Sequence, residues 1–272
     1  MNAWLRLPRS WRAYTGIATR SMQNTLAYRL SYVVNFASSF VLLIAMYALW
    51  SAIYAGRDEL AGMSWTQMKT YLIISFISNS LLSYYSESRI SGKILDGSVS
   101  ADLLKPLDFQ KARLAETLGS TVIEGGLTAI LTFIVVLSAS GILKPDFIHS
   151  LLFILSVLAS LMVKFGIVYM AGLLCFWSTG SLGIVWARMA VTSLFSGALV
   201  PLSFFPDWLE KLALVLPFQG IVHTPAAIYL EEVSAWGALG LLAVQCVWAC
   251  VLWLCGKLMW SWAVRQITIH GG

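Results

Sequence analysis

The sequence predicts an all-α integral membrane protein that forms one domain over residues 1–272. Hydrophobic residues make up 58% of the chain and charged residues 11%, whereas about a quarter of an ordinary globular domain is charged. Six apolar stretches meet or approach the roughly 20 residues that a membrane-spanning helix needs. The longest polar segment between them, residues 87–115, is too short to form a core of its own. The six predicted spans are residues 28–54, 67–86, 116–141, 147–177, 184–204 and 234–262.

Residues 1–27 predict a helix at the membrane interface rather than a cleaved signal, because they contain no central apolar run. Apolar and aromatic residues recur there at spacings of three and four, so they share one side of a helix. Pro8 confines the regular helix to the residues that follow it. The apolar side is expected to hold Trp4, Leu7, Trp11, Tyr14 and Ala18, and the opposite side Arg9, Arg12 and Arg20.

The positions of Lys and Arg predict how the chain is oriented. An even number of spans puts both termini on one side, and thirteen of the 18 Lys and Arg residues lie on that side, against four in the opposite loops. Cytoplasmic loops are enriched in Lys and Arg, so both termini are expected in the cytoplasm. Residues 234–272 then comprise the sixth span and a cytoplasmic tail. The same placement explains the net charge of +5 without nucleic acid as a partner. The four cysteines lie inside apolar stretches, where they predict neither a disulfide nor a metal site.

A proline-rich segment, residues 197–232, follows the fifth predicted span. Four of the seven prolines interrupt apolar sequence there, and each piece between them is too short to cross a membrane. We therefore expect short helices that enter the outer leaflet and return, with residues 205–233 as the re-entrant part and Asp207 capping a helix from Trp208. The segment either packs the outer ends of the spans or gates a path between them. The residues of this candidate gate are Pro201, Phe204, Phe205, Pro206, Pro217, Phe218 and Pro225.

Polar residues inside the predicted spans are a second group of candidates. Glu124 and Lys164 are ionisable and lie well within spans, where a charge costs on the order of 3 kcal/mol unless it is paired or wet. We hypothesise that the two form an ion pair between the third and fourth spans; the alternative is that either one lines a polar path. Serines and asparagines of the first two spans either join helices by hydrogen bonds or line the same path. The path-lining candidates are Asn35, Ser39, Ser78 and Asn79.

Two motifs carry a resemblance to a known family. The first runs from Ile94-Leu95-Asp96-Gly97-Ser98 to Leu103-Leu104-Lys105-Pro106-Leu107, and the second from Pro201-Leu202-Ser203-Phe204-Phe205-Pro206 to Leu216-Pro217-Phe218 and Pro225. With six spans in this order, the chain resembles the membrane subunit of a type-2 ATP-binding-cassette exporter. The first motif is similar to that of a subgroup of small permeases often found as two permeases with one ATPase. The resemblance implies a bacterial cytoplasmic membrane protein of several spans.

In that family the loop between the second and third spans carries a coupling helix that docks on the ATPase. Physical chemistry supports a short rod here, because Gly97 permits a sharp turn, Ser98 or Ser100 can cap a helix, and Pro106 stops it. We expect two exposed leucines to enter a groove on the partner, with Asp102, Lys105 and Asp108 at the rim. The implied docking residues are Gly97, Ser98, Ser100, Asp102, Leu103, Leu104, Lys105 and Pro106.

The chain contains no phosphate-binding loop. The fragments Gly92-Lys93-Ile94 and Gly256-Lys257-Leu258 lack the upstream glycine and the Ser or Thr that would hold Mg²⁺. The resemblance therefore implies no cofactor in this chain, ATP and Mg²⁺ on a separate ATPase present in two copies, and a second permease that is either a related chain or another copy. Membrane lipid is the remaining partner.

Two other classes of function stay open from the residues alone. An ATP-independent secondary transporter or channel would need no ATPase. An intramembrane enzyme would need a nucleophile and a base, or paired carboxylates, at one depth. The three histidines, His149, His223 and His270, lie near the outer face or the C-terminus and fit no such arrangement, so no catalytic residue is predicted. The sequence does not identify the transported substrate.

Overall fold

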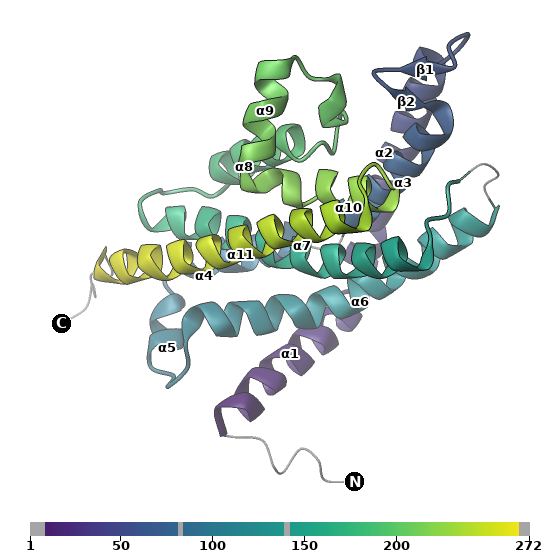
Figure 1. Cartoon of the computed structure of the whole chain (residues 1–272). Coiled ribbons are helices and arrows are strands. Elements are labelled where there is room, and N and C mark those ends of the chain that lie inside the picture. The colour runs from purple at the N-terminus through teal and green to yellow at the C-terminus, as the bar shows by residue number, and fades with distance from the viewer. Residues whose placement is uncertain (1–8, 81–83, 139–141, 267–272) are drawn as a thin grey trace.

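The structure is a computed structural model that describes residues 9–80, 84–138 and 142–266, and these residues form helices with one two-stranded antiparallel hairpin (Figure 1). The predicted all-α class is confirmed. The hairpin joins β1 (Glu59–Leu60) to β2 (Met63–Ser64) between the first two long helices after the N-terminal one. The α-helices are α1 (Arg9–Ala27), α2 (Arg29–Ile53), α3 (Trp65–Ser80), α4 (Tyr84–Leu95), α5 (Val99–Leu103), α6 (Phe109–Ser138), α7 (Phe147–Leu173), α8 (Leu182–Phe195), α9 (Asp207–Val215), α10 (His223–Tyr229) and α11 (Ala235–Ala263). The 3-10 turns are η2 (Leu174–Phe176), η3 (Leu202–Phe204), η4 (Pro217–Gly220) and η5 (Val264–Gln266).

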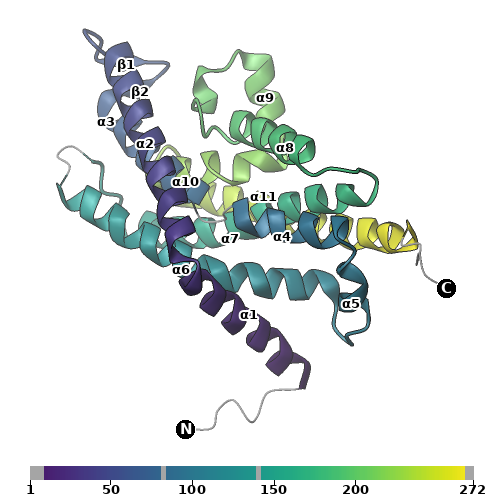
Figure 2. The same ribbon diagram turned by 180° about the vertical axis from the view of Figure 1, so that it is seen from behind.

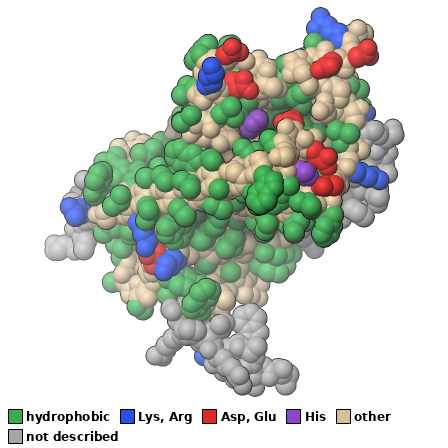
Figure 3. Space-filling view, viewed as in Figure 1, with side chains coloured by type: hydrophobic (Ala, Val, Ile, Leu, Met, Phe, Trp, Pro, Cys, Tyr) green, Lys and Arg blue, Asp and Glu red, His purple; other side chains and the backbone are tan. Residues whose placement is uncertain are grey.

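Among the described residues, two helical segments are long and apolar enough to cross a membrane, Phe147–Phe176 and Ala235–Ala263, with mean hydropathies of 2.4 and 2.2. Two shorter apolar helices, Ala37–Ile53 and Leu182–Phe195, accompany them. Figure 3 shows a broad zone of hydrophobic side chains across one face of the molecule, with the charged side chains gathered toward its ends. This composition is that of a membrane protein, while the full set of six spans remains a prediction.

Helix α7 lies at the centre of the molecule. It packs against α11, α10 and α4, and 56% of its apolar segment is buried, against 17% of that of α11. Phe165 and Tyr169 of α7 belong to a core cluster with Ile90 of α4. Helix α11 lies on the outside of this core, so most of its apolar surface faces away from the protein.

The N-terminal helix α1 packs closely on α6. A Cβ atom at Gly119 of α6 would overlap the backbone of Ala18 of α1, so the two helices approach as only a glycine allows. Ser21 and Thr25 continue the buried face of α1, while Trp11 is 62% exposed. Small residues therefore decide which face of α1 packs on α6, because they permit the close approach, and the interfacial role of the opposite side stays a prediction. Trp4 and Leu7 lie outside the described residues.

The polar segment expected as the loop 87–115 is mostly helical. Helices therefore continue past the predicted end of the second span and begin before the predicted start of the third. Helix α4 covers its first part because Ile90 and Ile94 pack into the core beside α7. Helix α6 begins seven residues before the predicted third span. The carboxylate of Asp108 accepts the backbone N–H of Lys111 at 2.9 Å, which satisfies one of the free donors of the first turn of α6.

The proline-rich segment consists of short helical pieces, as expected: η3, α9, η4 and α10. Pro206 stands immediately before α9 and Pro217 begins η4, positions where the missing N–H is harmless. The predicted cap, Asp207, is instead the first residue of α9 and makes no side-chain capping bond. Its charge favours the helix from within the first turn.

The two ends of the molecule differ in which segments they hold. Figures 1 and 2 both show α5, the first turn of α1 and the C-terminal end of α11 toward one end, and the β-hairpin and the start of α7 toward the other. At the second end Asp146 caps α7 by accepting the N–H of His149, and its own N–H donates to Glu231 Oε1 at 2.7 Å. These contacts fix the start of α7 to the chain that follows α10.

Candidate functional site

The candidate site is the turn that joins α4 to α6 through the short helix α5. Gly97 has φ +74°, a conformation that favours glycine, and the Asp96 carboxylate accepts the N–H of Ser98 at 2.8 Å. Ser98 stands at the N-cap position without a side-chain bond, whereas the hydroxyl of Ser100 donates to Gly97 O at 2.8 Å. Helix α5 ends at Leu103, before Pro106, so the turn is short and closely bonded.

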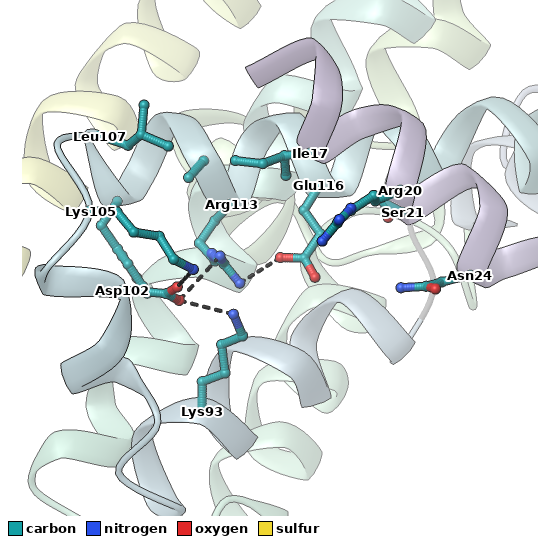
Figure 4. A pocket seen from close by; sticks show the side chains of 12 residues that line it. Ile17, Arg20, Ser21, Asn24, Lys93, Asp102, Lys105, Leu107, Arg113 and Glu116 are labelled. Carbon is teal, nitrogen blue, oxygen red and sulfur yellow. Dashed lines mark hydrogen bonds and ion pairs between the residues drawn. The ribbon is translucent and has the colours of Figure 1, made fainter. Parts of the chain in front are cut away.

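Asp102 is the centre of this site, and its position corrects the expectation that it lies at an exposed rim. Its side chain is only 7% exposed and pairs with cations from three segments, as Figure 4 shows. The reason is that α5 folds back beside the first turns of α6. The pairs join Asp102 to Lys93 Nζ at 2.9 Å, Lys105 Nζ at 2.6 Å and Arg113 Nη2 at 3.3 Å.

The charge state of Asp102 follows from these contacts. Burial raises the pKa of the carboxyl, but the hydrogen bonds from Lys105 and Lys93 and the charge of Arg113 outweigh it, so the pKa lies below its ordinary value. Asp102 is therefore an anion at neutral pH. A buried anion held by three cations fixes α5 to both α4 and α6.

A second acid extends the network to α1. Glu116 pairs with Arg113 at 2.5 Å and with Arg89 at 3.6 Å. Arg89 also donates to the hydroxyl of Ser21 on α1 at 3.0 Å. We call the group of Arg89, Lys93, Asp102, Lys105, Arg113 and Glu116 the Asp102 junction; it connects α1, α4, α5 and α6.

The outer surface of the turn is apolar at its tip. Leu104 is 88% exposed, Leu103 is 42% exposed, and Val99 is buried and anchors α5 from the inside. An exposed leucine on a turn held by ion pairs is a feature that a partner surface can cover. Lys105 and Pro106 beside it are also exposed.

A cavity of about 210 Å³ lies between α1 and this turn. It has polar and charged walls with a few apolar side chains, and Figure 4 shows the labelled residues around it. The lining residues are Ile17, Arg20, Ser21, Asn24, Lys93, Asp102, Lys105, Leu107, Phe109, Ala112, Arg113 and Glu116.

The ion pairs between described residues do not include the expected pair of Glu124 with Lys164. Both side chains are buried, but Lys164 Nζ donates to the backbone carbonyl of Asn79 at 2.6 Å. Asn79 lies in the last turn of α3, where helical carbonyls have no partner within the helix, so the ammonium group finds an acceptor there. The structure thus brings Lys164 to Asn79, a path-lining candidate, rather than to Glu124.

The other path-lining candidates are spread over α2 and α3. Ser78 is buried, and its hydroxyl has no hydrogen-bond partner in the described part of the chain. Ser39 is half-buried. The side chain of Asn35 lies outside the described residues, so a common surface for these candidates stays a prediction.

The candidate gate residues are mostly packed rather than free. Pro201, Pro217 and Pro225 are buried, and the ring of Phe204 lies against Trp50 of α2 with centroids 5.0 Å apart. Phe218 faces Phe195 of α8 at 6.2 Å. Phe205 is half-buried and Pro206 is exposed.

Sequence reasoning missed Gln245 of α11. Its amide Nε2 donates to Gly220 O at 2.6 Å and to Ser156 O at 3.0 Å, and its Oε1 accepts the hydroxyl of Ser156 at 2.9 Å. These bonds join α7, α11 and the proline-rich segment. The signal was available, because a single amide in a long apolar helix needs a partner.

A comparison with protein families places most of the chain in one of them. The sequence model of a family described as ABC-2 family transporter protein matches residues 40–271, which is most of the chain. No curated protein matches the chain. The matched residues include α3 to α11 and the whole turn around Asp102.

Proposed function

The chain belongs to the ABC-2 family of transporter proteins as a membrane subunit, and we propose that it is the permease of an exporter driven by a separate ATPase. Six spans, with residues 28–204 holding the first five and 234–272 the sixth with its tail, form half of the translocation path. The chain itself is a membrane subunit rather than an enzyme. ATP and Mg²⁺ bind to the ATPase, of which the complex holds two copies.

The observation that carries the proposal is the exposed tip of the Asp102 junction. Leu104 is almost fully exposed, while the residue two before it is buried among three cations. A turn with an apolar tip that is joined by ion pairs to α4 and α6 transmits the movement of a docked partner into both helices. In this proposal Leu103 and Leu104 enter a groove of the ATPase and α5 is the coupling helix.

A second permease completes the path. Apolar side chains of α2 are exposed along much of its length, including Val41, Leu42 and Ile44, so either lipid or a second permease covers them. A related chain or another copy of this one fills this role. Asn35, Ser39, Ser78 and Asn79 on α2 and α3 are the residues proposed to line the path, and the proline-rich segment is proposed to close its outer end.

The location follows from the same proposal. Both termini and α5 lie in the cytoplasm of a bacterial cell, at its cytoplasmic membrane, and the β-hairpin and the proline-rich segment lie outside. The basic residues of the Asp102 junction then stand on the side where Lys and Arg are enriched.

Co-purification with the candidate ATPase tests the proposal. Wild-type permease is expected to retain the ATPase in detergent and to support vanadate-sensitive ATP hydrolysis, and Leu103→Asp/Leu104→Asp to lose both. Leu212→Asp is the matched control, since Leu212 of α9 is also an exposed leucine but lies in the proline-rich segment. An undiminished complex in the double variant would exclude α5 as the docking site. If the wild type also binds no ATPase, an ATP-independent transporter becomes the better explanation.

A further inference from the structure

The cavity beside the Asp102 junction has the size of a small ionic group rather than of a transported drug. Its volume is about 210 Å³, whereas sites for drug-sized ligands occupy roughly 300–1,000 Å³. Its walls come from α1, α4, the α5 turn and α6 (Figure 4). A group bound there would contact α1 and the turn at the same time.

The charge of the cavity favours an anion. Four cations line it, Arg20, Lys93, Lys105 and Arg113, against two carboxylates. Both carboxylates already accept several cations: Asp102 pairs with three, and Glu116 pairs with Arg113 and with Arg89 just outside the lining. The positive charge therefore exceeds what the acids neutralise.

Two guanidinium groups have hydrogen-bond donors to spare. Arg20 forms no ion pair or side-chain hydrogen bond with any residue that the structure describes. Arg113 is 5% exposed, and its Nε has no acceptor. A buried N–H without an acceptor destabilises the folded state, so an acceptor oxygen in the cavity would stabilise this arrangement.

Neutral donors stand next to Arg20 on the same helix. Ser21 Oγ accepts a bond from Arg89, which leaves its own O–H free to donate. Asn24 lies one turn further along α1 and also lines the cavity. Guanidinium, hydroxyl and amide donors at one site are the groups that bind phosphate oxygens.

The surroundings indicate that the phosphate belongs to a lipid. Trp11 and Leu26 of α1 are more than half exposed. Trp11 precedes the cavity-lining residues of α1 in the sequence and Leu26 follows them, so α1 offers apolar side chains to the acyl chains of a lipid whose head group lies in the cavity. Basic pockets at the cytoplasmic ends of membrane helices are typical sites for anionic head groups. We propose that this cavity binds the phosphate of an anionic phospholipid of the cytoplasmic leaflet; the choice of leaflet rests on the proposed function.

The bound phosphate acts as a link between α1 and the coupling turn. It accepts from Arg20, Ser21 and Asn24 on one side and from Lys93 and Arg113 on the other. The lipid thereby holds α1 and the α5 turn together, and it leaves Leu104 exposed because Leu104 does not line the cavity.

The test uses the purified permease alone, in an uncharged detergent, and measures thermal unfolding by tryptophan fluorescence. Vesicle-derived phosphatidylglycerol, phosphatidylcholine and inorganic phosphate are added separately. Phosphatidylglycerol is expected to raise the unfolding temperature and phosphatidylcholine to leave it unchanged. Arg20→Gln is expected to weaken the apparent affinity for phosphatidylglycerol about fivefold, the effect of one cation near a charged membrane surface. Arg12→Gln is the matched control, because Arg12 is an exposed cation of the same helix that does not line the cavity.

Three results would overturn the proposal. An equal loss in Arg12→Gln and Arg20→Gln would mean that the surface charge of α1 attracts the lipid and that no site exists. An equal, Arg20-dependent shift with inorganic phosphate alone would assign the cavity to a soluble phosphate. No shift with phosphatidylglycerol would exclude an anionic head group. Because no ATPase is present, each outcome is independent of whether the co-purification experiment supports an exporter.

Discussion

The Asp102 junction and the proline-rich segment are held in place by different interactions. The junction contains five ion pairs that join α4, α5 and α6. Among the described residues, the proline-rich segment has one contact of this kind, between Glu231 Oε1 and His149 Nδ1 at 4.0 Å near its end; hydrogen bonds to backbone carbonyls and ring packing hold the rest. The difference follows from the surroundings, since charges are tolerated near water and are costly in an apolar region.

This contrast has a mechanical consequence. Lys93 and Lys105 of the junction are partly exposed, and exposed ion pairs exchange partners at little cost, so these two cations let the junction follow a docked partner that brings its own charges. A backbone carbonyl in an apolar region has no second donor within reach, and losing its bond costs the whole desolvation energy. We therefore expect the junction to be the adaptable end and the proline-rich segment to be the stiff end, and the following changes test that difference.

The largest effect is expected where α1 meets α6 beside the junction. Gly119→Ala adds a methyl group that overlaps the backbone of Ala18, so the helices must separate, at a cost of about 3 kcal/mol. Gly126→Ala is the control on the same helix, because nothing lies within 4 Å of its added Cβ. Unfolding in detergent followed by tryptophan fluorescence should show a large loss for the first variant and none for the second. Equal stability of both would mean that α1 does not pack on α6.

The next effect is expected at the centre of the junction. Asp102→Asn removes the anion that three cations share, although Arg113 keeps its pair with Glu116. The change should cost about 2 kcal/mol, less than the loss of a fully buried pair, because Lys93 and Lys105 are partly exposed. Asp96→Asn is the control, since the asparagine oxygen still accepts the N–H of Ser98.

The pH dependence gives a second reading of the same variant. The pKa of Asp102 is lowered in the folded protein, so its contribution is fully present above the unfolded pKa near 3.8 and is lost as the pH falls through the folded pKa. The stability gap between wild type and Asp102→Asn should be constant from pH 8 to 5 and narrow only below about pH 4. A gap that already closes between pH 7 and 6 would contradict a depressed pKa.

An effect of similar size is expected at Gln245, which anchors the proline-rich segment. Gln245→Met keeps the volume but removes the donors to Gly220 and Ser156, at a cost of roughly 2 kcal/mol. Measuring Ser156→Ala and the double variant separates the side-chain bond from the backbone bonds. If the losses of stability in the two single variants add up to that of the double variant, Gln245 and Ser156 do not act together. That result would contradict a stiff proline-rich segment held by Gln245.

The sequence predicted the long apolar helices well. Helices α2, α7 and α11 begin within one residue of the predicted spans, because a polar cap precedes two of them: Asp146 accepts the N–H of His149 and Ser234 that of Gly237. Runs of this length leave few alternatives to a helix. Local sequence therefore determined these boundaries.

The partners of charged residues were harder to predict. Asp102 lies close in sequence to both Lys105 and Arg113, but only the fold of α5 back onto α6 decides that it is buried. Lys164 was expected to pair with Glu124, whereas its Nζ donates to Asn79 O at the end of α3. Polar residues 87–95 were expected in a loop, although Ile90 and Ile94 give that stretch one buried helical face. Tertiary packing decides each of these cases.

The smallest effect tests the stiff end through one hydroxyl group. Tyr71 of α3 is buried and donates to Gly197 O at 2.8 Å, where the chain enters the proline-rich segment with φ +83° at Gly197. Tyr71→Phe leaves that carbonyl without its donor and should cost about 1 kcal/mol. Tyr47→Phe is the control, because the ring of the exposed Tyr47 lies tilted against Trp65 and its hydroxyl forms no hydrogen bond among the described residues. If the outer end is stiff, hydrogen exchange at 197–205 should rise in Tyr71→Phe and stay unchanged around α5; faster exchange around α5 instead would reverse the assignment of the adaptable and the stiff end.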